Sequence, residues 1–194
     1  MSDSPVPVLR LAEGLLLRAF AETDLSALLE AFADPAVQNW NPGPDGNDPE
    51  AAARDWMTGR NDWSAGSHAS WALAAADGLL LGSVSLHKID LDQADAEIGY
   101  WLAPWARGRG RATLAVNAAT GYAFDALGLH RVHLFHAVEN VASCRVATGA
   151  GYGLEGHLRQ SYRYPDGIYR DEHLHARLDS DPFPYAHLHG GTDG

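Results

Sequence analysis

The feature that most restricts the fold is a short loop rich in glycine and arginine, RGRGRA at residues 107–112. Residues 95–102 before the loop alternate as a strand does, and residues 111–127 after it are rich in alanine, as in a long helix. Glycine lets the backbone approach a ligand closely, and the first amides of a helix have no partners within the helix. The loop therefore predicts a cradle of N–H groups for an anion such as a phosphate.

The charge of the whole chain makes this basic loop more informative. The chain carries 25 Asp and Glu against 14 Lys and Arg, which gives a formal net charge of -11 at pH 7. An acidic chain argues against nucleic acid as the main partner, because phosphate backbones bind to basic faces. Three arginines within five residues then indicate a small anionic ligand, and a solvated basic turn is the alternative.

The remaining bulk features are typical of one globular domain. The chain has 194 residues, of which 46% are hydrophobic, and no apolar run approaches the length of a membrane span. The N-terminus lacks a signal-peptide pattern, and Cys144 is the sole cysteine, which fits a reducing compartment. We therefore expect a cytoplasmic protein with no membrane partner. Its domain is expected at residues 8–178, with flexible termini at 1–7 and 179–194.

The order of the predicted elements is that of an α+β protein. We expect a mixed, mostly antiparallel central sheet of about seven strands with helices on both faces. The expected strands lie within residues 8–20, 70–76, 79–89, 95–102, 130–138, 152–164 and 169–178. The expected helices cover residues 25–33, 49–66, 111–127 and 140–149, and residues 34–48 are expected to form a Pro/Gly/Asn loop.

The glycine–arginine loop and the strand before it resemble a known family. Arg107-x-x-Gly110-x-Ala112 matches the pyrophosphate-binding signature Gln/Arg-x-x-Gly-x-Gly/Ala of the GNAT superfamily of N-acetyltransferases. The preceding EIGYWL, at residues 97–102, is similar to the strand that leads into that loop. This resemblance implies the GNAT fold, in which two neighbouring strands splay apart to admit the cofactor.

A second match indicates a branch of the family. Asn140-x-x-Ser143, followed by GYGLEGHLR at residues 151–159, resembles the RimJ/RimL branch of ribosomal-protein N-terminal acetyltransferases and their relatives. The resemblance covers roughly residues 8–178 and is closest over 95–178.

The resemblance implies acetyl-CoA as co-substrate and direct acetyl transfer from its thioester to a primary amine in a ternary complex. The pantetheine arm would lie in the splayed strands and the pyrophosphate at the loop. The implied cofactor contacts are Trp101, Leu102, Ala103, Arg107, Gly108, Arg109, Gly110, Arg111, Ala112, Asn140 and Ser143.

Amine acetylation needs a base to keep the acceptor neutral and a donor for the departing thiolate. Glu97 is the candidate base, acting through water, and the alternative is an edge carboxylate facing solvent. Ser143 is the candidate donor to the thiolate, and the alternative is an ordinary serine in the first turn of a helix. Asn140 is expected to bond the pantetheine amide, to cap the helix, or to do both, since a cap uses only the side-chain oxygen.

The other reactive residue types are assigned no chemistry. Cys144 has no evident base partner in the sequence and is expected to be a small buried thiol. His173 and His175 could share a strand face, and His187 and His189 repeat the spacing, but without a nearby constellation of cysteines or acids the pattern is weak evidence for a metal. We therefore expect no metal.

The acceptor is expected to be the N-terminal α-amine of a protein or peptide. Such an amine has a pKa of about 7.7–8.0, against about 10.4 for lysine, so a modest base suffices. The alternatives are a small amine such as an antibiotic, polyamine or amino-acid derivative, and a catalytically inactive CoA-binding module. Trp40 and Glu97 are the expected acceptor-side residues, and the protein is expected to be a monomer or a homodimer.

Overall fold

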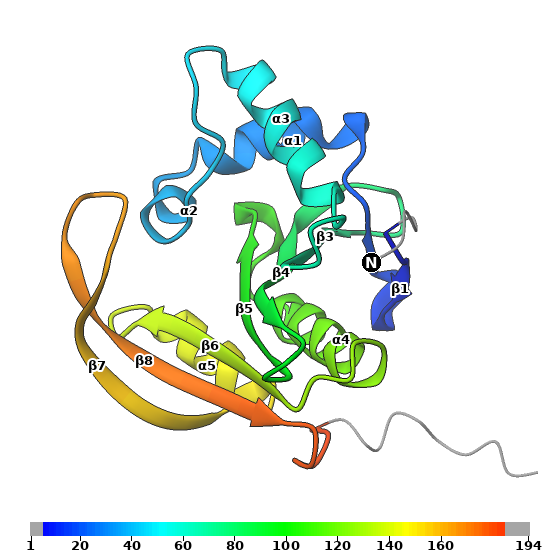
Figure 1. Cartoon of the computed structure of the whole chain (residues 1–194). Coiled ribbons are helices and arrows are strands. Elements are labelled where there is room, and N and C mark those ends of the chain that lie inside the picture. Colours follow the sequence, from blue (N-terminus) through cyan, green and yellow to red (C-terminus); the bar gives the residue numbers. More distant parts are fainter. Residues whose placement is uncertain (1–5, 185–194) are drawn as a thin grey trace, which may run out of the picture.

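The computed structural model describes residues 6–184 (Figure 1). These residues form one open sheet of eight strands in the order β1-β2-β3-β4-β5-β6-β8-β7. The strands are β1 (Leu9–Arg10), β2 (Leu16–Arg18), β3 (Ala69–Ala74), β4 (Leu80–Asp90), β5 (Asp95–Leu102), β6 (Arg131–Ala137), β7 (Gly153–Arg163) and β8 (Tyr169–Leu178). The helices are α1 (Leu25–Phe32), α2 (Pro35–Trp40), α3 (Pro49–Asn61), α4 (Arg111–Asp125) and α5 (Val141–Gly149), with short 3-10 turns at Ala12–Gly14, Glu22–Asp24 and Pro104–Ala106.

The helices cover both faces of the sheet. Neighbouring residues of a strand point to opposite faces, and Trp101 and Tyr100 of β5 show which helix lies on which side. The Trp101 ring packs edge-on against Phe32 of α1 with a centroid separation of 5.0 Å, whereas the Tyr100 hydroxyl reaches Ser143 of α5. The predicted α+β class with a mixed, mostly antiparallel sheet is confirmed, with eight strands where about seven were expected.

The helix starts follow from short capping signals. Asp48 accepts hydrogen bonds from the amides of Glu50 and Ala51, and Pro49 occupies the first turn of α3, as expected for an Asp-Pro start. The same signal, Asp34 followed by Pro35, starts α2, where the Asp34 carboxylate accepts from Val37 N at 3.0 Å. The prediction of a loop at 34–48 was therefore wrong for α2, because burial of Val37 adds to the cap and stabilises the short helix.

β5 and β6 diverge after three paired residues. All other neighbouring strands are antiparallel, but β5 and β6 are parallel and pair only at Asp95–Arg131, Ala96–Val132 and Glu97–His133. Beyond Glu97 the rest of β5 has no partner on β6, and each strand keeps its other neighbour, β4 or β8. This divergence is the splayed pair of strands expected for the fold.

The β7–β8 hairpin curves back toward α2 across this divergence (Figure 1). Trp40 at the end of α2 meets Tyr164 beyond β7 edge-on, with ring centroids 5.6 Å apart. After β8 the described chain continues, and the Arg177 guanidinium lies 4.4 Å from the ring centroid of Phe183. No helix among the described residues is long and apolar enough to cross a membrane.

Candidate active site

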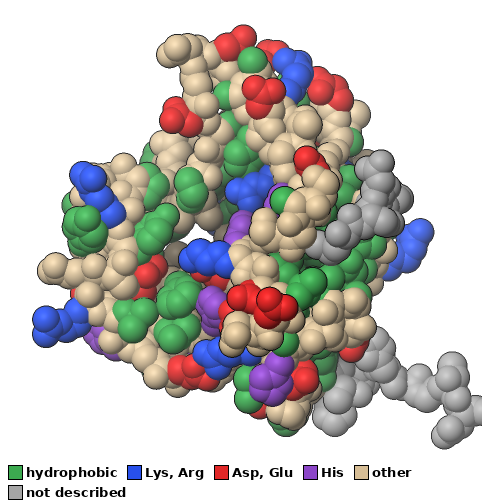
Figure 2. Space-filling view, viewed as in Figure 1, with side chains coloured by type: hydrophobic (Ala, Val, Ile, Leu, Met, Phe, Trp, Pro, Cys, Tyr) green, Lys and Arg blue, Asp and Glu red, His purple; other side chains and the backbone are tan. Residues whose placement is uncertain are grey.

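A cavity of about 1020 Å³ opens where β5 and β6 separate and extends to α2 and the β7–β8 hairpin. Figure 2 shows the surface hollowed between these two parts, with Lys and Arg side chains at its margin. The expected site residues that line this cavity are Trp40, Glu97, Trp101, Leu102, Arg107, Gly108, Gly110, Arg111, Ala112, Asn140 and Ser143.

Two expected cofactor residues, Ala103 and Arg109, do not line the cavity. Ala103 is fully buried, and its N–H donates to the carbonyl of Leu81 at 2.9 Å. Arg109 is exposed. Contact of either residue with the cofactor stays a prediction.

The glycine–arginine loop has the backbone geometry of an anion site. Gly108 and Gly110 adopt φ values of 79° and 70°, in the left-handed region that favours glycine, and Gly110 is the N-cap of α4. The first N–H groups of α4 therefore lie at the end of the helix that borders the cavity, and they have no hydrogen-bond partners within the helix. Nε of Arg111 is also buried with no hydrogen-bond partner among the described residues. Unpartnered donors at the positive end of a helix suit an anionic ligand.

Arg107 links this loop to the acceptor side of the cavity. Its guanidinium donates to Asp34 Oδ1 at 3.1 Å, and the same carboxylate caps α2. The hydrogen bond from Arg107 holds the pKa of Asp34 below its ordinary value. The pair is exposed to solvent, so the bond is open to exchange with another anion.

Tyr100 and Ser143 join the two sides of the splay. The Tyr100 hydroxyl donates to Ser143 Oγ at 2.9 Å, and Ser143 N donates to Asn140 Oδ1 at 3.1 Å. The capping role of Asn140 is thus confirmed. Burial raises the pKa of Tyr100 to about 12, so its hydroxyl stays protonated at neutral pH. Tyr100 was not among the sequence-based candidates, although it lies beside Trp101 in the EIGYW strand.

Glu97 lines the cavity and forms an ion pair with Lys88. Lys88 Nζ donates to Glu97 Oε2 at 2.8 Å, and this hydrogen bond raises the pKa of Lys88. The Lys88 side chain is 77% exposed and the Glu97 side chain 24%, so solvent screens the pair. The geometry leaves the second carboxylate oxygen of Glu97 available to a water or an amine.

His87 is a titratable side chain of the cavity that was not among the sequence-based candidates. It lies directly opposite Glu97 on β4 and lines the same cavity. Burial lowers the pKa of His87 to about 4, so the imidazole is neutral at pH 7. A Cβ atom on Gly99 would lie 3.4 Å from His87 Nε2, so glycine leaves space beside the ring. The cross-strand pairing of the β4–β5 hairpin is the signal that places His87 next to Glu97.

Aromatic and acidic side chains form the far end of the cavity. Trp40 and Tyr164 meet there, and the Arg170 guanidinium lies 5.6 Å and 5.2 Å from their ring centroids. Glu172 is 7% exposed and accepts from Tyr164 Oη and Ser161 Oγ, both at 2.9 Å. Trp40 lines the cavity from the end of a helix and not from a loop as expected, and its contact with the acceptor stays a prediction.

Splayed parallel strands, an anion cradle at a helix start and a bridging cavity are the arrangement of a GNAT-type acyltransferase fold. Residues 14–153 match the family model described as an acetyltransferase (GNAT) domain, and the chain belongs to this family.

The chain is similar in sequence or structure to several acetyltransferases whose names differ in the acceptor. The chain is 27% identical to the ribosomal-protein-serine acetyltransferase of Escherichia coli (strain K12) over 88% of this chain and 96% of the relative. It is 35% identical to the spermidine N(1)-acetyltransferase of Vibrio cholerae over 47% of this chain and 53% of the relative. With several curated relatives the match spans about half of the relative's length. Mycobacterium smegmatis RimJ in complex with CoA-disulfide superposes with a TM-score of 0.77 at 26% identity, over 91% of this chain and 88% of that one.

Proposed function

We propose that this protein is an N-acetyltransferase that moves the acetyl group of acetyl-CoA to the N-terminal α-amine of a protein or peptide. Family membership, the relatives' names and the RimJ complex with CoA-disulfide support the class of reaction. The acceptor is inferred from the cavity. We also infer a cytoplasmic protein that acts as a monomer or homodimer.

The residues at the splay fit acetyl-CoA. The loop amides at Gly108 and Gly110, together with the unpartnered Arg111 Nε, would hold the pyrophosphate. The unpaired edge of β5 offers backbone groups to the amide-bearing pantetheine arm. Asn140 uses its oxygen as a cap, which leaves its NH2 group for a carbonyl of that arm. Acetyl-CoA supplies the activated acyl group, and the chain supplies position and proton transfer.

Two sets of side chains can handle the protons. Glu97 and the neutral His87 lie opposite one another on the acceptor side, where one of them, through water, takes a proton from the amine. Ser143 lies on the other face, and the donated hydrogen bond from Tyr100 leaves its own hydroxyl hydrogen free for the departing sulfur. Because Tyr100 is protonated at pH 7, it can pass its proton to Ser143 as Ser143 protonates the sulfur, and Tyr100 then regains a proton from solvent.

One observation carries the acceptor assignment: each of the two carboxylates that line the cavity already has a partner, and only one oxygen of Glu97 is left for an amine. Glu97 pairs with Lys88, and Glu172 accepts from two hydroxyl groups. Arg60 also lines this side of the cavity. A polyamine carries several positive charges and needs several free carboxylates, whereas an α-amine brings one charge that is easily lost. The lining therefore favours a single amine on a peptide-like acceptor.

A small-amine acceptor is the second candidate, because the V. cholerae relative is named as a spermidine acetyltransferase. The Trp40–Tyr164 pair supports it as well, since aromatic faces attract cationic amines.

A competition assay separates the candidates. The purified protein and acetyl-CoA are mixed with a peptide bearing a free N-terminus, the same peptide N-blocked with an internal lysine, spermidine and an aminoglycoside. We expect mass spectrometry to show the acetyl group on the free N-terminus first. Preference for spermidine, the aminoglycoside or the blocked peptide contradicts the proposed α-amine acceptor. If no amine is acetylated, the proposed acetyltransferase activity is wrong.

A further inference from the structure

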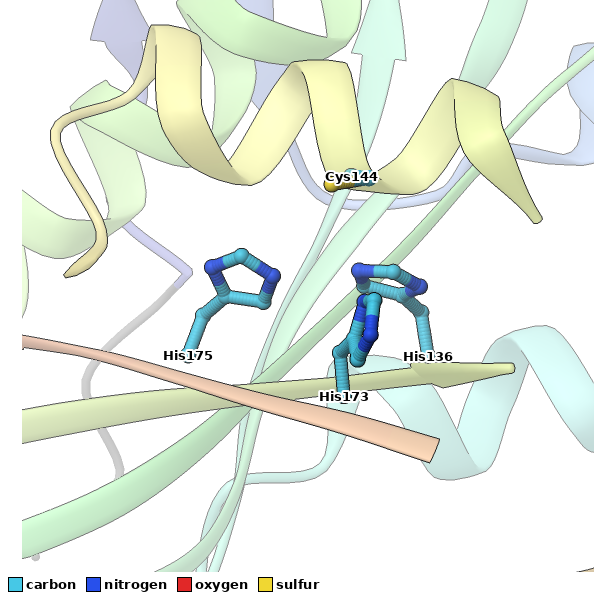
Figure 3. A group of neighbouring side chains, drawn as sticks. All are labelled: His136, Cys144, His173 and His175. Atoms are coloured by element: carbon cyan, nitrogen blue, oxygen red, sulfur yellow. The ribbon is translucent and has the colours of Figure 1, made fainter. Parts of the chain in front are cut away.

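Three histidines and the sole cysteine gather on the inner side of α5, outside the proposed chemistry. His136 belongs to β6, His173 and His175 belong to β8, and Cys144 belongs to α5. One ring nitrogen of each histidine and the sulfur of Cys144 all lie within 4.8 Å of one another. Figure 3 shows the cysteine on the helix above and the three imidazoles rising from the strands below into one space. Cys144 is distant from these histidines in the sequence but lies beside them in the fold, so the expectation of no nearby cysteine was wrong.

The strand register brings the histidines together. His136 and His173 are directly opposed across the antiparallel β6–β8 pair, so their side chains lie on the same face. His175 follows His173 by two residues and shares that face. The His136 and His175 rings are nearly parallel, with centroids 5.2 Å apart and an interplanar angle of 24°. Sequence spacing alone relates only His173 and His175, which is why the cluster was not foreseen.

Hydrogen bonds turn a free nitrogen of these rings toward the shared space. Nδ1 of His136 lies 2.8 Å from the carbonyl of Ala137, and Nδ1 of His175 lies 3.4 Å from the carbonyl of Tyr152. A carbonyl only accepts, so each Nδ1 carries the proton and each Nε2 keeps its lone pair. Carbonyl-fixed tautomers of this kind are usual for histidines that bind metal.

Two histidines of the cluster are buried, Cys144 and His173 are half-buried, and one nitrogen of each histidine lacks a partner. His136 is 4% exposed and His175 is 1% exposed. Nε2 of both rings and Nδ1 of His173 are buried with no hydrogen-bond partner among the described residues. Buried polar groups without partners are rare and call for a ligand.

From this geometry we propose that His136, Cys144, His173 and His175 bind one divalent transition-metal ion of the zinc class in a four-coordinate site. Imidazole nitrogens and thiolate sulfurs are the ligand types that bind zinc in four-coordinate, tetrahedral sites. A tetrahedral site needs ligand atoms about 3.3–3.6 Å apart, given metal–ligand bonds of about 2.0–2.3 Å. The four atoms must therefore draw together by about 1 Å, which side-chain rotation allows. On binding, the Cys144 thiol releases its proton to solvent.

The four ligands fill the coordination of the metal, so the ion has a structural role. It ties α5 to β6 and β8, the wall of the splay opposite β5. Ser143 directly precedes Cys144, so the metal would also fix the helix turn that carries the proposed proton donor. Nothing in this proposal depends on the identity of the acceptor.

Cobalt binding to untagged, chelator-treated protein tests the site, because cobalt reports its ligands by colour. We expect one Co²⁺ per chain, with a sulfur-to-cobalt charge-transfer band and the intense visible bands of tetrahedral geometry, both abolished by added Zn²⁺. Cys144→Ser should remove the charge-transfer band and weaken binding by at least about 100-fold, since changes even to groups outside the ligand set cost up to about 100-fold.

Two controls keep the test specific. His130→Asn changes an exposed histidine paired with Asp179, and His187→Asn with His189→Asn changes two histidines outside the described residues. Both variants should keep the cobalt spectrum and affinity. His136→Asn should weaken binding as Cys144→Ser does, and circular dichroism reports whether each variant is folded. The proposal is overturned if the wild type binds no cobalt, if a folded Cys144→Ser keeps the spectrum, or if the double variant alone loses it.

Discussion

Substitution of Gly110 by valine separates the geometry of the anion cradle from its charge. Gly110 has a φ of 70° and no atom within 4 Å of the place where a Cβ would stand. The new side chain therefore meets no clash in the free protein, but it forces a β-branched residue into the left-handed region. Either the loop relaxes and its amides turn away, or the side chain occupies the side of the cradle that a pyrophosphate needs.

The size of the effect follows from the groups that are lost. A hydrogen bond to a charged group contributes about 1.5–3 kcal/mol, so loss of one loop amide should weaken acetyl-CoA binding by about 10- to 150-fold. Arg109 is exposed, and removal of an exposed ion pair changes affinity by at most about fivefold. Gly110→Val should thus weaken binding more than Arg109→Ala does.

Gly128→Val is the matched control. Gly128 also has a positive φ, of 67°, and also has nothing within 4 Å of its Cβ position. It lies beyond the other end of α4, a helix of 15 residues and so about 22 Å long. Both variants should lose about 1–2 kcal/mol of stability, which lowers the melting temperature by about 2–8 °C.

Calorimetric titration with acetyl-CoA and thermal melts of all three variants provide the assay. We expect similar melting temperatures for Gly110→Val and Gly128→Val, but weakened binding only for Gly110→Val. If Arg109→Ala weakens binding more than Gly110→Val, or if both glycine variants weaken it equally, the loop backbone is not the anion site.

Three further predictions concern the cavity. Asn140→Asp keeps the helix cap but loses the NH2 group, so the melting temperature should stay the same while KM for acetyl-CoA rises. If the melting temperature and the use of acetyl-CoA both fall to the same degree, Asn140 acts only as a cap. Glu97→Gln cannot take a proton and should lower kcat severalfold at pH 7. The loss should be smaller at high pH, where more of the amine is neutral. If kcat at pH 7 is unchanged, Glu97 takes no part in the reaction. Because the folded pKa of His87 is about 4 and the ordinary value is 6.5, the unfolded state binds more protons between these values. Stability in urea titrations should therefore be full above pH 6.5 and fall toward pH 4, and His87→Gln should flatten this fall; an identical pH profile contradicts the neutral buried ring.

Local signals in the sequence predicted the parts of the fold that depend on neighbouring residues. The Asp48-Pro49 start of α3, the Asn140 cap and the glycine loop before α4 all lie where they were expected, because each rests on contacts within three or four residues. The same rule applied to Asp34 would have found α2. The density of Pro, Gly and Asn after Trp40 hid this six-residue helix.

Contacts between distant residues were not predictable in this way. Tyr100 and Ser143 are 43 residues apart and meet only because the sheet opens between their elements. Cys144 and the three histidines come from three elements. The β6–β8 register brings the histidines together, and the packing of α5 on these strands adds Cys144. A single sequence shows alternation along one strand, but it does not show which residues of another strand lie opposite.

The divergence of β5 from β6 leaves two sheet edges inside the molecule. An exposed edge invites the strand of another protein, and proteins usually guard against this with charges, prolines or bulges. Here the two unpaired edges face each other across the space between β5 and β6, which closes at the Glu97–His133 pair. Neither edge is therefore on the outside of the sheet, where another protein's strand could pair with it. In the function proposed above, the pantetheine arm of acetyl-CoA, with its own amides, would lie against one of these edges and take the place of a neighbouring strand.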